Sequence, residues 1–68
     1  MTVNSWKTAI QIVEEVGAYK VEAVFRYRHV YTKDTLYAVF LKNQYIDIYQ
    51  SPNCECIEKI FEQGEWIK

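Results

Sequence analysis

The chain has few of the residues that interrupt regular secondary structure. Its 68 residues include two glycines and one proline, and no segment is of low complexity. A glycine-rich phosphate-binding loop is therefore excluded, because such loops place several glycines close together. The hydrophobic fraction of 50 % is ordinary for a globular protein, so we expect residues 1–68 to fold as a single domain.

The sequence also lacks a strong excess of either charge. Its formal net charge is −1, which argues against a strongly cationic nucleic-acid binder. No apolar run is long enough to span a membrane, and no basic n-region followed by an apolar h-region opens the chain. We therefore expect a cytoplasmic protein with no membrane partner, in which Cys54 and Cys56 are reduced.

Residues that carry catalysis or bind metals are scarce. His29 is the only histidine, and both serines are placed to cap helices. The Cys54-x-Cys56 pair falls short of the three or four protein ligands of a zinc site. The sequence thus predicts no metal, no cofactor and no catalytic residue, and a protein that is not an enzyme.

Aromatic residues, in contrast, are abundant. All six tyrosines lie within residues 19–49, together with two of the three phenylalanines. This composition is typical of β-strands. One face of a small sheet cannot bury so many large side chains, so we expect some of them to face a partner.

Hydrophobic spacing predicts helices at both ends of the chain. Residues 5–16 form the first, with Ser5 as N-cap, Gly17 as C-cap and an apolar stripe of Trp6, Ala9, Ile10, Val13 and Val16. Residues 52–63 form the second, capped by Ser51, begun by Pro52 and ended by Gly64. Its buried stripe is Cys54, Ile57, Ile60 and Phe61.

Between the helices we expect three antiparallel strands, over residues 20–32, 35–42 and 45–50. Tight turns at 33–34 and 43–44 join them. The predicted fold class is therefore α+β, in the order α-β-β-β-α, with both helices on one face of a three-stranded sheet.

This order and length resemble the double-stranded-RNA-binding domain, and HicA-type toxin ribonucleases share the arrangement. The resemblance to HicA-type enzymes implies a catalytic histidine on the first strand, which would be His29. The local run 25–30, Phe-Arg-Tyr-Arg-His-Val, lacks the glycine and hydroxyl residue of the HicA motif. Double-stranded-RNA binding implies lysines at the start of the second helix, where this chain has Ser-Pro-Asn-Cys-Glu.

Alternation along residues 20–32 predicts that the odd-numbered side chains face the helices. A two-residue turn at 33–34 would set Tyr27 opposite Phe40 and add Leu36, Ala38 and Phe40 to the core. The third strand allows two registers. A two-residue turn at 43–44 would bury Asp47, whereas a longer turn or a bulge would bury Ile46 and Ile48. We favour the second, because burying an Ile side chain is worth about 1.5–3 kcal/mol.

The face left open should bind a partner, because exposed apolar patches mark interaction sites and Tyr and Arg are enriched at binding hot spots. The predicted partner-binding residues are Arg26, Arg28, Tyr37, Val39, Tyr45 and Tyr49. Residues 19–50 carry five basic and three acidic side chains, and residues 51–68 carry two and four. The sheet is therefore mildly basic and the tail acidic.

We therefore predict a small non-enzymatic regulatory module that docks a protein partner, or a second copy of itself, through this face. Two alternatives stay open. One is a single-stranded nucleic-acid-binding module, in which Tyr37, Tyr45 and Tyr49 stack on bases while Arg26 and Arg28 meet phosphates. The other is a HicA-type ribonuclease that uses His29.

Overall fold

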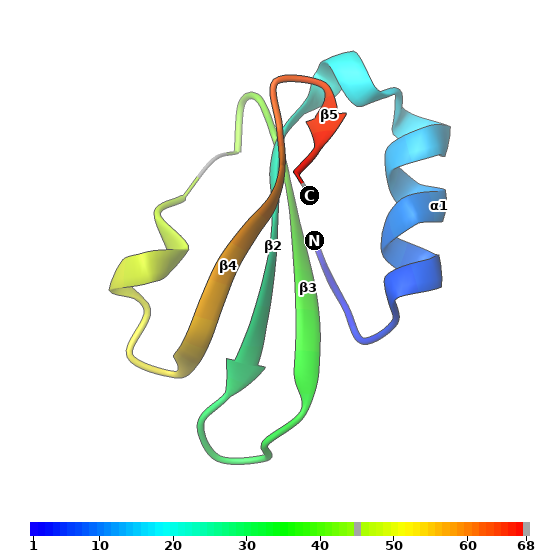
Figure 1. Cartoon of the computed structure of the whole chain (residues 1–68). Helices are drawn as coiled ribbons and strands as arrows, with labels where there is room; N and C mark the ends of the chain where they lie inside the picture. The colour runs from blue at the N-terminus through cyan, green and yellow to red at the C-terminus, as the bar shows by residue number, and fades with distance from the viewer. Residues whose placement is uncertain (45, 68) are drawn as a thin grey trace.

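A computed structural model describes residues 1–44 and 46–67. In this part of the chain, five antiparallel strands form one curled sheet in the order β1-β3-β2-β4-β5, with one helix on one face (Figure 1). The helix is α1 (Trp6–Val16), and two short 3-10 turns are η1 (Ala18–Lys20) and η2 (Ile48–Gln50). The strands are β1 (Thr2–Val3), β2 (Val21–His29), β3 (Thr35–Leu41), β4 (Cys54–Glu62) and β5 (Glu65–Trp66).

The predicted three-stranded sheet with two helices on one face is therefore wrong, and so is its likeness to the double-stranded-RNA-binding topology. The coarser α+β class holds, because helix and antiparallel sheet are both present. In Figure 1, α1 and η2 (yellow) lie on opposite sides of the sheet. We call the two sides the helix-side face and the loop-side face.

The first helix agrees with its prediction. The Ser5 side chain accepts a hydrogen bond from the Thr8 backbone nitrogen at 3.5 Å, and Gly17 ends the helix with a φ of 101°. Ala9 and Val13 are buried against the sheet. The capping residues and the apolar stripe together explain why this segment is helical.

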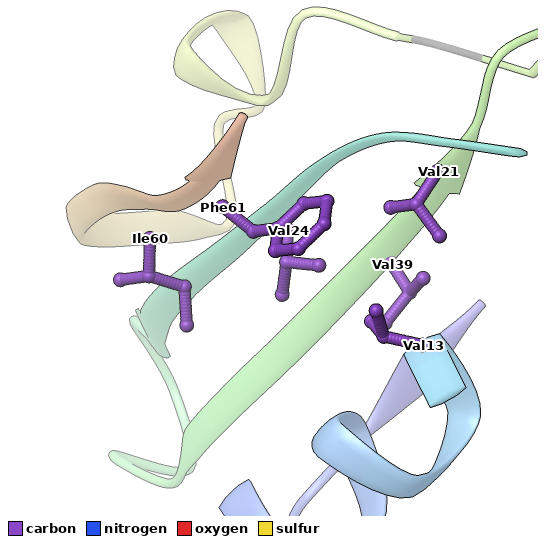
Figure 2. Close-up of a cluster of buried hydrophobic side chains, with 6 residues drawn as sticks. All are labelled: Val13, Val21, Val24, Val39, Ile60 and Phe61. Carbon is purple, nitrogen blue, oxygen red and sulfur yellow. The ribbon is translucent and has the colours of Figure 1, made fainter. Parts of the chain in front are cut away.

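The helix packs on the face that we had expected to be open. Val13 of α1 meets a buried cluster of Val21, Val24, Val39, Ile60 and Phe61 (Figure 2). An extra residue in β2 between Val21 and Ala23 breaks the strict alternation and brings Val21 to the same side as Val24. Beyond this bulge, the odd-numbered residues Ala23, Phe25 and Tyr27 belong to a separate cluster, so the prediction that the odd-numbered side chains of this strand face the helices is wrong for them.

The loop-side face has its own core. Ala23, Phe25, Tyr27 and Ala38 form a buried cluster there with Ile48 of η2. These β2 and β3 residues share a face, as predicted, but the predicted register is wrong. Tyr27 pairs with Leu36 rather than Phe40, because residues 30–34 make a longer turn. The shift is four residues, an even number, so each side chain keeps its face.

The predicted third strand over residues 45–50 is wrong. Asp47 caps η2 instead, with its side chain accepting from the Tyr49 backbone nitrogen at 3.0 Å. Such an aspartate turn competes with strand pairing. Ile48 is buried as expected, whereas Ile46 is 68 % exposed. Tyr45 lies outside the described residues.

The second predicted helix is also wrong, because residues 54–62 form β4 and pair with β2. Two register shifts interrupt the alternation of β4, so its apolar residues recur at three- and four-residue spacing, as they would in a helix. The first lies near Cys56, whose φ is 54°, and it leaves Cys54 and Ile57 on the same loop-side cluster. The second places the adjacent residues Ile60 and Phe61 together in the helix-side cluster.

A strand is preferred in this segment because it packs on both sides of the sheet. A helix would bury one stripe only, and intrinsic helix propensity is weak enough for tertiary packing to override it. Ser51 and Pro52 precede the strand, and Ser51 ends η2 as its C-cap instead of beginning a helix. Gly64 forms a two-residue hairpin turn with Gln63, and both have the positive φ that tight hairpins prefer.

Candidate functional site

The structure divides the six predicted partner-binding residues. Four of them lie on the helix-side face: Arg26, Arg28, Tyr37 and Val39. Arg26 and Arg28 share this face with Val24, because alternate residues of one strand point to the same side. Tyr37 pairs with Arg26 and Val39 pairs with Val24, and directly paired residues also share a face. Val39 is 0 % exposed and packs in one cluster with Val13, so it is not at the surface. Tyr49 is on the loop-side face, where its ring meets Phe25 edge-on at 5.5 Å. Tyr45 lies outside the described residues.

Helix α1 covers only part of the helix-side face of the sheet. The buried cluster beneath it occupies the half of the sheet that contains Val24 and Val39. The other half contains Arg26, Arg28 and Thr35, whose side chains are partly or fully exposed. This uncovered half is what remains of the predicted open face.

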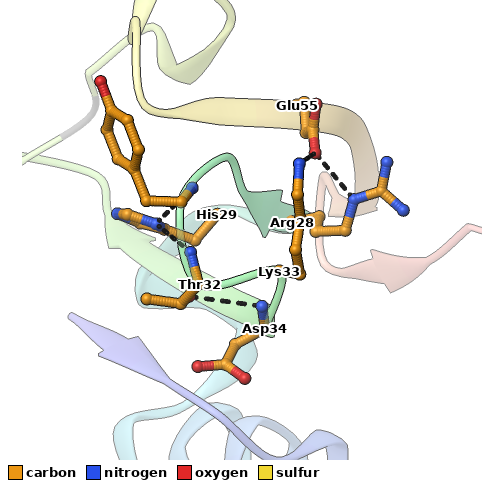
Figure 3. Close-up of polar contacts among 7 residues, drawn as sticks. Arg28, His29, Thr32, Lys33, Asp34 and Glu55 are labelled. Carbon is orange, nitrogen blue, oxygen red and sulfur yellow. Dashed lines mark hydrogen bonds and ion pairs between the residues drawn. The ribbon is translucent and has the colours of Figure 1, made fainter.

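Ion pairs cross the uncovered half from β2 to β4. Arg26 Nη2 donates to Glu58 Oε2 at 2.7 Å, and Arg28 Nε donates to Glu55 Oε1 at 2.9 Å. Lys33 Nζ reaches the same Glu55 oxygen at 3.2 Å (Figure 3). The basic and acidic segments seen in the sequence therefore neutralise each other across neighbouring strands.

These contacts set the protonation of Glu55. Hydrogen bonds from Arg28 and then Lys33 lower the pKa of its carboxyl group below the ordinary value. In turn, the hydrogen bond to Glu55 raises the pKa of the Arg28 guanidinium. Both groups thus stay charged at neutral pH, and each is already matched by an opposite charge.

Next to the ion pairs lies an aromatic hollow of about 350 Å³, which we call the tryptophan hollow. It is lined by Trp6, Arg26, Tyr37, Glu58, Lys59, Ile60 and Ile67. The Trp6 ring lies 5.8 Å from the Tyr37 ring and 4.9 Å from that of Trp66. Trp6 is still 43 % exposed, and Ile67 is 50 % exposed.

Sequence reasoning found Arg26 and Tyr37 but missed Trp6 and Ile67 as surface residues. Trp6 had been assigned to the buried stripe of the helix, because its spacing matches that stripe. Its position in the first turn of α1, at the end of the stripe, leaves the ring half uncovered. Ile67 follows β5, a two-residue strand that no pattern in the sequence had predicted.

His29 organises a turn. Its Nδ1 accepts hydrogen bonds from the backbone nitrogens of Tyr31 at 3.2 Å and Thr32 at 3.4 Å (Figure 3). Its own backbone oxygen accepts from Lys33 and its nitrogen donates to Asp34. These contacts give His29 a structural role at the end of β2.

The remaining reactive side chains do not form a cluster. Cys54 is partly buried and its Sγ donates to Ser51 Oγ at 3.4 Å, whereas Cys56 is exposed, and both are free thiols. Within residues 1–44 and 46–67, no group of three or more His, Cys, Asp and Glu side chains could hold a metal ion. In the same residues, no helix has the length and apolar character needed to cross a bilayer.

Fold and surface together define a small antiparallel α+β domain with an aromatic hollow beside a row of ion pairs. No protein-family model, curated protein or solved structure matches the chain.

Proposed function

We propose that this chain is a small, non-enzymatic, cytoplasmic binding module that docks a protein partner through the tryptophan hollow. The observation that carries the proposal is the exposed indole of Trp6 beside Tyr37 and Arg26. Trp, Tyr and Arg are the residue types most enriched at binding hot spots. An apolar hollow with a charged rim suits the insertion of an apolar side chain from the partner.

Within this proposal, Arg26, Arg28 and Tyr37 remain partner contacts, and Trp6 and Ile67 join them. Val39 is buried under α1 and makes no direct contact with the partner, but it belongs to the cluster on which Tyr37 packs. Tyr49 faces the other way, and Tyr45 stays a prediction. The Arg26–Glu58 pair at the rim offers both a donor and an acceptor, which favours a polypeptide with mixed polar groups.

The charges support a protein partner over a nucleic acid. Arg26 and Arg28 are each paired with a glutamate, so neither is a free cation for a phosphate. Tyr37 and Tyr49 lie on opposite faces and do not form one stacking platform. A ribonuclease that uses His29 is disfavoured as well, because the two backbone donors already occupy its Nδ1.

The test compares affinity capture by the wild type with capture by two matched variants. Ile67→Asp places a charge at the rim of the hollow, and Ile46→Asp makes the same change at an exposed site on the other face. We expect Ile67→Asp to lose the captured protein and Ile46→Asp to keep it. With the purified partner, calorimetry should show that Ile67→Asp weakens binding by more than about 2 kcal/mol, the hot-spot range.

Three outcomes would overturn the proposal. The two variants could capture the same proteins as the wild type, which would remove the hollow from the interface. The eluate could contain nucleic acid whose binding falls steeply with salt, which would favour the stacking alternative. Sedimentation could show that the only partner is a second copy of this chain, which would replace docking of another protein by self-association.

A further inference from the structure

A second hollow lies on the loop-side face, away from the tryptophan hollow. It has a volume of about 440 Å³ and is bounded by β1, β2, β3, the residues around η2 and the start of β4. We call it the Tyr27 hollow. Its volume falls within the range of about 300–1,000 Å³ that is usual for small-molecule sites.

The walls of the Tyr27 hollow are mainly apolar. Ala38 and Phe40 of β3 contribute one side, and Ile46 and Ile48 contribute another. Ile46 is exposed although its side chain is large and aliphatic. Exposure of such an apolar surface to water is unfavourable, and a ligand that covers it lowers the free energy.

Uncharged polar groups are set into these walls. Tyr27 is 8 % exposed, and burial raises the pKa of its phenol, against a smaller opposing effect of a hydrogen bond with the Thr2 side chain. The phenol therefore stays neutral at neutral pH. The Ser51 hydroxyl and the Cys54 thiol also line the hollow, and the thiol donates a hydrogen bond to the hydroxyl.

The charge of the lining restricts the ligand. Asp47 is its one charged residue in the part of the chain that the structure describes, and no lysine or arginine lines it there. Both Asp47 oxygens already accept hydrogen bonds, from the Tyr49 backbone nitrogen and from Gln50 Nε2. A phosphate or carboxylate would have no cation to pair with and would meet a carboxylate, which is unfavourable.

We propose that the Tyr27 hollow binds a small neutral molecule with an apolar body and one hydrogen-bonding group, such as a hydroxyl. The body would cover Phe40, Ile46 and Ile48, and the polar group would meet the hydroxyls of Tyr27 or Ser51. This site is independent of the proposed docking surface, because the two hollows lie on opposite faces and share no lining residue.

The test uses 2-naphthol as a neutral probe and 2-naphthoate as its anionic counterpart. Cys54 lines the hollow and Cys56 does not, so alkylation by iodoacetamide can report occupancy residue by residue through mass spectrometry. We expect 2-naphthol to slow alkylation of Cys54 several-fold in a saturable manner and to leave Cys56 unchanged. We expect 2-naphthoate to protect neither thiol.

Two variants locate the site. Ile46→Asp should abolish protection by 2-naphthol, and Ile67→Asp should preserve it, the reverse of their expected effects on protein capture. Failure of 2-naphthol to protect Cys54 in the wild type would overturn the proposal. Equal protection by 2-naphthoate would overturn the assigned ligand class, and unchanged protection in Ile46→Asp would overturn the assigned location.

Discussion

Trp6 and Trp66 meet with their ring centroids 4.9 Å apart and their planes at 67°. Trp6 follows β1 at one edge of the sheet, and Trp66 belongs to β5 at the other edge. The contact therefore spans the sheet, which is possible because the sheet curls and brings its two edges toward each other. Phe61 continues the aromatic contact, with its centroid 4.8 Å from that of Trp66.

The tryptophan contact should stabilise the closed curl of the sheet. Trp66→Ala and Trp6→Ala should each lower the free energy of unfolding, and the double variant should lose less than the sum. Edge-to-face aromatic pairs contribute about 0.5–1.5 kcal/mol beyond burial, which is the coupling we expect from a double-mutant cycle in urea. Additive effects would show that the two rings do not stabilise each other.

Val39 should tolerate no charge. It is fully buried beneath α1, so Val39→Asp should cost more than about 4 kcal/mol and unfold the domain. Thr35→Asp is the matched control, because Thr35 lies on the same strand and face but is exposed. Circular dichroism and thermal melting of the two variants measure the difference. A folded Val39→Asp protein would mean that this half of the face is open after all.

Acid should remove the stabilisation that Glu55 provides. Arg28 and Lys33 lower the pKa of its carboxyl in the folded state, so the folded chain holds this proton less tightly than the unfolded chain. Its contribution is therefore present above the ordinary pKa of 4.5 and is lost as the pH falls through the lowered folded value. Urea unfolding at several pH values should show wild type more stable than Glu55→Gln at neutral pH, with the gap closing in acid.

The exposed Glu65→Gln variant is the control for this pH experiment. The Glu55→Gln difference at neutral pH should exceed that of this control, and added salt should narrow it, because exposed ion pairs are screened. A difference for Glu55→Gln that does not change with pH would rule out the ion pairs as its cause.

The two glycines should respond differently to a methyl group. Gly17 has a φ of 101°, and an added Cβ would lie 2.8 Å from the Tyr19 ring, whereas Gly64 has a φ of 79° with open space around it. Gly17→Ala should cost about 1–3 kcal/mol, the range for a strained backbone, and Gly64→Ala should cost less. Chemical unfolding of both variants measures this order, and the reverse order would contradict it.

Parts of this structure follow from local sequence. The caps at Ser5 and Gly17 and the stripe through Ala9 and Val13 are sufficient for α1, because they depend on residues within four positions of one another. The alternation of β2 and β3 likewise predicts two strands whose odd and even residues separate between faces. The candidate contacts Arg26, Arg28 and Tyr37 were found in this way.

The rest was decided by tertiary packing. Bulges near Glu22 and Cys56 change which side chains share a face, and a pattern with a fixed period does not reveal them. The segment 54–62 has helical spacing, yet it forms a strand because β2 offers it two faces to pack on and arginines to pair with Glu55 and Glu58. The tryptophan hollow arises only when the curled sheet brings residues 6 and 67 together, a relation that no local spacing encodes.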